Sequence, residues 1–150
     1  AAQLLKRAGL VARALNDVMT LHKLRGEANA TQEWAEAALA IMTEQGFAMI
    51  GPIVFTRGWA LAAQGRHEEG MAQMCQGLAA QRAEGAGVTL AEFPTRLGEA
   101  YGRIGQAEEG LRLLADALAV VDKALCYEAE MHRIKGELLL RYPVLATPQA

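Results

Sequence analysis

Apolar side chains recur along most of this chain at the spacing of three and four residues that is typical of amphipathic α-helices. The pattern predicts helices over about residues 4–24, 29–45, 47–64, 67–84, 92–104, 108–121 and 127–141. In the second of these the expected inward stripe is Trp34, Ala37, Ala38, Ile41 and Gln45, and in the fourth it is Met71, Met74, Cys75, Leu78 and Ala79.

Glycine, proline and capping residues predict where the helices begin and end. We expect Gly26 and Gly46 to end the first two helices, because glycine readily adopts the left-handed conformation of a C-terminal cap. Asn29 and Gln32 have the spacing of a capping box and predict the start of the second helix. Pro52 falls near the first turns of the predicted third helix, where a missing N–H is tolerated best; a start delayed to Gly51-Pro52 is the alternative.

An internal repeat relates two halves of the predicted helical region. Residues 57–78 return as residues 97–118, and seven of the 22 aligned positions are identical. The identical pairs are Gly58/Gly98, Ala60/Ala100, Gly65/Gly105, Glu68/Glu108, Glu69/Glu109, Gly70/Gly110 and Leu78/Leu118. A repeat of about 40 residues predicts stacked helix pairs, each burying one face on its neighbour.

Four of the repeated glycines fall inside predicted helices: Gly58, Gly70, Gly98 and Gly110. A glycine there costs about 0.8 to 1 kcal/mol relative to alanine. Their recurrence therefore predicts close approach of the paired helices.

The sequence predicts an all-α superhelix of about seven helices, in three antiparallel pairs and one unpaired C-terminal helix. We expect a single domain over residues 1–150, with repeats at about 9–46, 47–87 and 89–125 and a half-repeat at 127–141. Because the chain opens on Ala-Ala-Gln without methionine, it is expected to be a fragment of a larger protein.

This pattern resembles the tetratricopeptide (TPR) family of helical repeats. The positions that carry the resemblance are Gly98, Tyr101, Gly105, Gly110 and Ala117-Leu118. The chain departs from the family in three ways: its period is near 40 residues where the family has 34, Gly70 and Gly110 replace an alanine, and the first pair has Met19 in place of glycine.

A second resemblance is to the helical-repeat tail of large bacterial regulators. It covers most of the chain and is carried by GFAMIGPIVFTRGWALAAQG, AEFPTRLGEAYGRIGQAEEGLRLLADALAVV and YEAEMHRIKGELLLR. In those regulators the repeats accompany a signalling ATPase and a cyclase-type or DNA-binding domain. The resemblance implies a regulatory, bacterial context and transfers no catalytic residue.

Composition and charge narrow the classes of partner. Hydrophobic residues make up 52% of the chain, charged residues 21%, and the net charge is -2, so there is no bulk attraction for nucleic acid. The longest charge-free runs, residues 45–56 and 70–81, are shorter than the roughly 20 residues that cross a membrane. Cys75 and Cys126 form no CxxC pattern, so we expect buried thiols in a reducing cytoplasm.

No sequence motif indicates catalysis, a metal or a cofactor. The phosphate-binding GxxxxGK[ST], the nucleophile GxSxG and the metal-binding HExxH are absent from the sequence. The repeated Glu68-Glu69 and Glu108-Glu109 are explained by favourable charge at helix N-termini. The sequence therefore predicts a protein that is not an enzyme.

The resemblance implies that the first helix of each pair lines a concave binding face. Residues expected on or beside this face are Asn16, Thr20, Lys23, Phe55, Trp59, Glu99, Arg103, Arg133, Glu137 and Arg141. Trp59 is singled out because it occupies the place held by Glu99 and Glu137 in later repeats, and exposed aromatics are enriched in interaction hot spots. The charged positions fit equally well a solvated surface of i, i+4 ion pairs.

Two functions follow as hypotheses. The first is a protein-protein interaction module that binds a protein or peptide, including domains of its own polypeptide or a second copy in a homodimer. The alternative is a sensor that binds a peptide or small molecule and regulates an attached ATPase, cyclase or DNA-binding domain.

Overall fold

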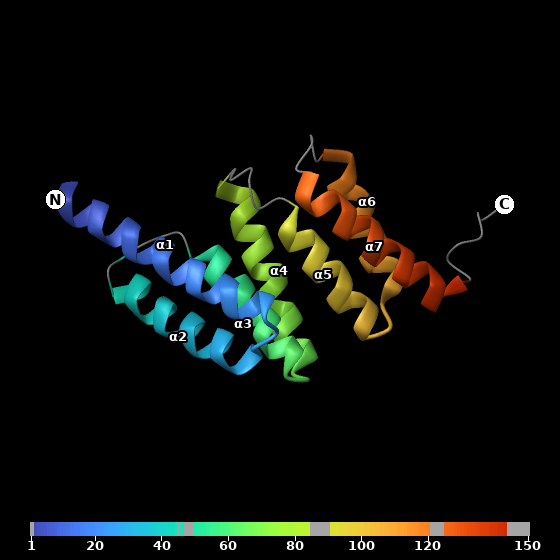
Figure 1. Ribbon diagram of the computed structural model, residues 1–150, viewed down its shortest axis with the longest axis horizontal. Helices are drawn as coiled ribbons and strands as arrows, with labels where there is room; N and C mark the ends of the chain where they lie inside the picture. The colour runs from blue at the N-terminus through green and yellow to red at the C-terminus, as the bar shows by residue number, and fades with distance from the viewer. Residues whose placement is uncertain (1, 45, 47–49, 85–90, 121–124, 144–150) are drawn as a thin grey trace. The chain divides into compact units, whose positions relative to one another are not determined.

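The computed structural model describes residues 2–44, 46, 50–84, 91–120 and 125–143, and within these ranges it is entirely helical, with seven helices and no strand (Figure 1). The helices are α1 (Ala2–Leu24), α2 (Ala28–Glu44), α3 (Gly51–Ala63), α4 (His67–Glu84), α5 (Glu92–Arg103), α6 (Ala107–Val120) and α7 (Leu125–Arg141). The all-α prediction is confirmed. Among the described helices, not one combines the length and apolar character needed to span a bilayer.

The chain forms two compact units, Ala1–Glu84 and Gly85–Ala150. In the first unit α1 packs on α2, α2 on α3 and α3 on α4, with a smaller contact between α1 and α3. In the second unit α5, α6 and α7 pack on one another. Each unit has a hydrophobic core of its own.

The helix boundaries follow the predicted glycines. Gly26 and Gly46 have φ of 73° and 68°, the left-handed conformation expected at the C-terminal ends of α1 and α2. The capping role of Asn29 was wrong, since α2 already begins at Ala28 and the Glu27 carbonyl accepts hydrogen bonds from the Thr31 amide and hydroxyl, both at 2.9 Å. The third helix starts at Gly51, the later of the two starts that the sequence left open.

The buried face of α2 differs from the predicted one. The buried residues are Thr31, Ala35, Ala38 and Met42, so only Ala38 of the predicted stripe is buried. Trp34, Ala37 and Ile41 are exposed, and Gln45 lies outside the described residues. Both stripes of this helix are apolar, so periodicity alone could not decide which one faces α1 and α3.

The glycines of α3 and α4 lie where the two helices meet. A Cβ atom on Gly58 would approach the Gly70 carbonyl oxygen to 2.5 Å, and one on Gly77 would approach the Gly51 carbonyl oxygen to 2.6 Å. The backbones are therefore in contact, which confirms the predicted close approach in this unit. With Gly70 and Gly77 in the interface, Met71, Met74 and Leu78 are buried, whereas Cys75 and Ala79 are exposed.

The exposure of Cys75 corrects the expectation of a buried thiol. Positions 75 and 79 lie on the far side of α4 from α3, because the glycines and not the cysteine face the partner helix. The side chain of Cys126 lies outside the described residues.

The core of the second unit is formed by Ala91, Ala107, Leu114, Ala117, Met131, Ile134 and Leu138. Gly110 repeats the close approach seen in the first unit, since a Cβ atom there would lie 2.8 Å from the Gly98 carbonyl oxygen. Of the three consecutive leucines 138–140, Leu138 is buried, Leu139 is half-buried and Leu140 is 83% exposed. A helix cannot turn three successive side chains toward one neighbour.

Candidate functional site

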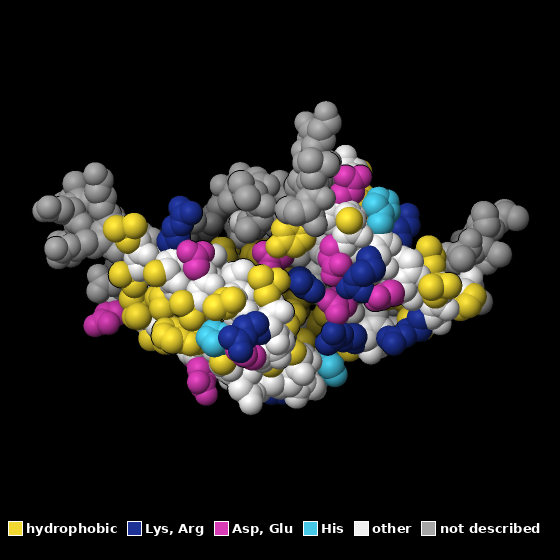
Figure 2. All heavy atoms as spheres, viewed as in Figure 1, with side chains coloured by type: hydrophobic (Ala, Val, Ile, Leu, Met, Phe, Trp, Pro, Cys, Tyr) yellow, Lys and Arg dark blue, Asp and Glu magenta, His cyan; other side chains and the backbone are white. Residues whose placement is uncertain are grey.

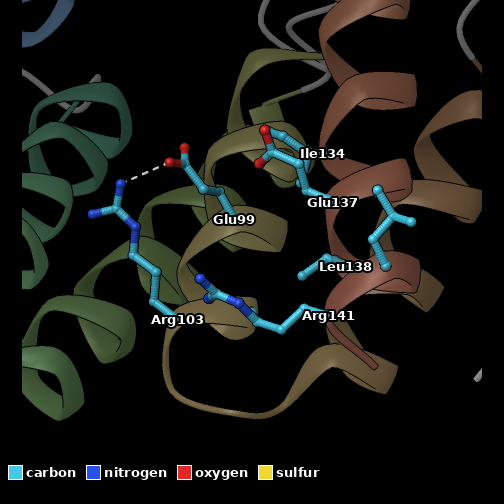
Figure 3. Close-up of a pocket in the computed structure, with 8 residues that line it drawn as sticks. Glu99, Arg103, Ile134, Glu137, Leu138 and Arg141 are labelled. Carbon is cyan, nitrogen blue, oxygen red and sulfur yellow. Dashed lines mark hydrogen bonds and ion pairs between the residues drawn. The ribbon is translucent and has the colours of Figure 1, made fainter. Parts of the chain in front are cut away.

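A groove lies between α5 and α7 in the second unit, with a volume of about 560 Å³ (Figure 3). Its charged walls come from both helices: Glu99 and Arg103 from α5, and Glu137 and Arg141 from α7. We call this site the α5–α7 groove. Three of its four charged residues were predicted binding residues, and Arg141 was expected beside them.

The floor of the α5–α7 groove is apolar. Ile134 and Leu138 belong to the buried core, and Leu140 extends the apolar surface to the solvent. Gly102 makes this floor possible, because Leu138 Cδ2 occupies the space that a Cβ atom at position 102 would need. The groove thus combines an apolar floor with charged walls, the arrangement that orients a partly apolar ligand.

Ion pairs fix the α5 wall of the groove. Arg103 Nη2 lies 2.7 Å from Glu99 Oε1, the predicted i, i+4 pair, drawn as a dashed line in Figure 3. Arg96 Nη1 lies 3.4 Å from Glu99 Oε2 and 3.9 Å from Glu130 Oε1, so it links α5 to α7. Glu99 therefore has two arginine partners and is held in place along the wall.

The α7 wall is ordered by Arg133. Its guanidinium lies 2.7 Å from Glu130 Oε1 and also pairs with Glu137. The hydrogen bond from Arg133 lowers the pKa of the Glu130 carboxyl, and the same interaction raises the pKa of Arg133. Arg133 does not itself line the groove; it holds Glu137, which does.

Arg141 differs from the other arginines of this site. Within the described residues it forms no ion pair, whereas Glu137 pairs with Arg133. Figure 3 shows Arg141 extending from the end of α7 toward α5. The ion-pair network has three arginines (96, 103 and 133) and three glutamates (99, 130 and 137), so its charges balance and Arg141 adds one positive charge to the site.

The remaining predicted binding residues lie in the first unit. The prediction of Phe55 as a binding residue was wrong, because its side chain is fully buried. Its Cβ atom lies 2.7 Å from the position that a Cβ atom on Gly77 would take. Lys23 is likewise buried, at 5% exposure. Trp59 is half-buried on α3 in the first unit and is not among the residues that line the α5–α7 groove. Asn16 is exposed and Thr20 half-buried, both on α1.

Sequence reasoning missed the apolar floor of the groove. The sequence did not predict Gly102, Ile134 or Leu138 there, because packing in the core or between repeats explains each of these positions equally well. The one available signal was the run Leu138 to Leu140, which cannot be buried as a whole and so leaves an apolar surface beside Arg141.

In the part of the chain that the structure describes, no group of three or more histidine, cysteine, aspartate or glutamate side chains is arranged to hold a metal ion. No protein family model, curated protein or solved structure matches the sequence.

Proposed function

We propose that this chain is a non-catalytic interaction module that binds a peptide segment of a partner protein in the α5–α7 groove. The observation that carries the proposal is the apolar floor of Ile134, Leu138 and Leu140 between walls that present charges of both signs. The partner includes other domains of the same polypeptide, in keeping with the resemblance to the repeat tails of bacterial regulators.

Recurrent close packing of helices supports this proposal. It occurs in both units, at Gly58 and Gly70 and again at Gly98 and Gly110. Repeats of the TPR type, which we propose for this chain, use their helices as a rigid support for a binding face. A face supported in this way loses little conformational entropy when a peptide binds, which favours affinity.

The ion pairs support recognition more than stability. Exposed pairs contribute only about 0.2 to 1 kcal/mol each, so Glu99–Arg103 and Arg133–Glu137 add little to folding. They do position carboxylates and guanidinium groups along both walls, where they can select a peptide by its charge pattern.

A sensor of small molecules is the second candidate function. The groove volume of about 560 Å³ lies within the range of roughly 300 to 1,000 Å³ that is common for small-molecule sites. In that case ligand binding would regulate an attached ATPase, cyclase or DNA-binding domain.

Selection of a random-peptide phage library on the 150-residue chain tests the proposal. Selected peptides are expected to lose about tenfold or more in affinity for Arg141→Glu and Leu140→Glu, because both changes alter the groove without removing a buried contact. Arg112→Glu is the matched control, since Arg112 is an exposed arginine on α6, outside the groove.

The groove assignment fails if the selected peptides bind Arg141→Glu and Leu140→Glu as tightly as the unaltered chain. A second outcome is that no peptide is selected, while a small-molecule thermal-shift screen yields ligands whose binding the same two variants weaken. In that case the sensor function replaces the interaction-module function. Trp59→Ala, measured alongside, shows whether the first unit takes part in binding.

A further inference from the structure

Large hydrophobic side chains are exposed mainly on the first two helices. Among the described residues, six of the seven exposed large hydrophobics belong to α1 or α2: Leu10, Val11, Leu21, Leu24, Trp34 and Ile41. Figure 2 shows hydrophobic side chains gathered over this part of the first unit. A contiguous apolar surface of this kind is a sign of an interaction site.

Two stripes make up this surface. On α1, Leu10, Ala14 and Leu21 are exposed at i, i+4 and i+11, with the exposed Asp17 at i+7 between them, and thus lie along one side of the helix. On α2, Trp34, Ala37 and Ile41 are exposed at i, i+3 and i+7. We call these six apolar residues together the α1–α2 face.

We propose that the α1–α2 face binds the same face of a second copy of this chain, forming a twofold symmetric dimer in which α1 packs antiparallel on α1 and α2 on α2. A twofold interface requires each helix to be complementary to its own reversed copy. The α1–α2 face meets this requirement in both its apolar spacing and its charges.

One register pairs the large apolar residues of each helix with those of its copy. When two copies of α1 run antiparallel and the twofold axis passes between residues 15 and 16, Leu10 lies opposite Leu21 of the second copy. For α2 a centre between residues 37 and 38 places Trp34 opposite Ile41 of the second copy. Both pairings unite a large side chain with another large side chain.

One twofold axis serves both helices. Leu24 ends α1 and Ala28 begins α2, so these two residues are taken as level with one another. Counting equal numbers of residues along α1 and α2 from these two positions, the centre between residues 15 and 16 of α1 is level with about residue 37 of α2. This position is within about one residue, or 1.5 Å, of the centre that the pairing of the two α2 helices requires. The two stripes thus agree on one axis.

Charge selects the same register. With the centre at 15–16, exposed Arg13 lies near Asp17 of the second copy, so each dimer has two opposite-charge pairs. A shift of the centre to residue 17 would pair Leu10 with Leu24, but it would also bring the two Asp17 carboxylates together. Like-charge contact disfavours the shifted register.

Sedimentation equilibrium of the 150-residue chain over a concentration series tests the dimer. We expect a monomer–dimer equilibrium whose dissociation constant rises by about tenfold or more in Leu21→Glu and in Trp34→Glu. Ala115→Glu is the matched control: it introduces the same charge at an exposed apolar residue of α6, outside both the α1–α2 face and the α5–α7 groove, and should leave the equilibrium unchanged. Circular dichroism checks that every variant keeps its helical content.

A charge-swap cycle tests the register. Arg13→Asp and Asp17→Arg should each weaken the dimer, because each places like charges opposite one another, and the double variant should restore it. A chain that stays monomeric at all concentrations, or a dimer that tolerates Leu21→Glu and Trp34→Glu, overturns the proposal; a double variant no better than the singles overturns the register. Peptide binding in the α5–α7 groove is measured independently of these outcomes.

Discussion

Gly58 of α3 lies against Gly70 of α4 so closely that a Cβ atom on Gly58 would be 2.5 Å from the Gly70 carbonyl oxygen. The neighbouring atom belongs to backbone and cannot move without shifting a helix. The close packing of α3 on α4 accounts for two glycines that would otherwise weaken their helices by about 0.8 to 1 kcal/mol each.

Gly58→Ala should therefore lower the free energy of unfolding by about 1 to 3 kcal/mol, the usual cost of overpacking. Gly136→Ala is the control, since Gly136 also lies within a helix but a Cβ atom there would meet nothing within 4 Å. It should raise the free energy of unfolding by up to about 1 kcal/mol through helix propensity. Urea unfolding measures both, and equal effects of the two substitutions would contradict the contact.

Gly98 should tolerate alanine better than Gly58 does. A Cβ atom on Gly98 would lie 3.0 Å from Leu114 Cγ, and a leucine side chain can shift where a backbone cannot. Gly98→Leu, however, should destabilise by about 1 to 3 kcal/mol, because the larger side chain has no room beside Leu114. Thermal or urea unfolding in which Gly98→Leu is neutral would disprove the close packing of α5 on α6.

Phe55 and Trp59 should differ in their contributions to stability. Phe55→Ala is expected to cost about 3 to 5 kcal/mol, since its side chain is fully buried. Trp59→Ala should cost less, because Trp59 is only half-buried. Chemical denaturation of the two variants makes the comparison; a larger loss for Trp59→Ala would place Trp59 in the core and remove it as a binding residue.

Acid should weaken the pairing of Glu130 with Arg133. The folded-state pKa of Glu130 is lowered from an ordinary value of 4.5, chiefly by the hydrogen bond from Arg133. The pairing therefore stabilises the fold above pH 4.5 and loses this effect as the pH falls through the lowered pKa. Glu130→Gln should lower the free energy of unfolding by about 0.2 to 1 kcal/mol near neutral pH and should leave it unchanged in strong acid.

Urea unfolding at a series of pH values measures the difference in free energy of unfolding between Glu130→Gln and the unaltered chain, which should disappear in strong acid. Glu128→Gln, at an exposed position two residues earlier on α7, is the control and should show a smaller difference from the unaltered chain at neutral pH. A Glu130→Gln difference that persists unchanged at pH 2 would show that packing, not charge, is responsible.

Local features of the sequence predicted the helices well. Gly26 and Gly46 ended α1 and α2 because the left-handed conformation is readily adopted by glycine itself. Pro52 left two starts open for α3, of which the structure has the later, at Gly51. The close approach of helices at Gly58 and Gly70 was also predictable, since an unfavourable residue repeated within helices requires a compensating contact.

Only the tertiary structure decided which apolar residues are core and which are surface. Trp34 and Ile41 alternate with Ala38 and Met42 on α2, and the choice between the two stripes depends on where α1 and α3 lie. Phe55 was misplaced for the same reason, because its burial depends on the bare backbone of Gly77 in the next helix. The floor of the α5–α7 groove likewise exists only where Leu138 of α7 meets Gly102 of α5, since periodicity records the faces of one helix and not the position of its neighbours.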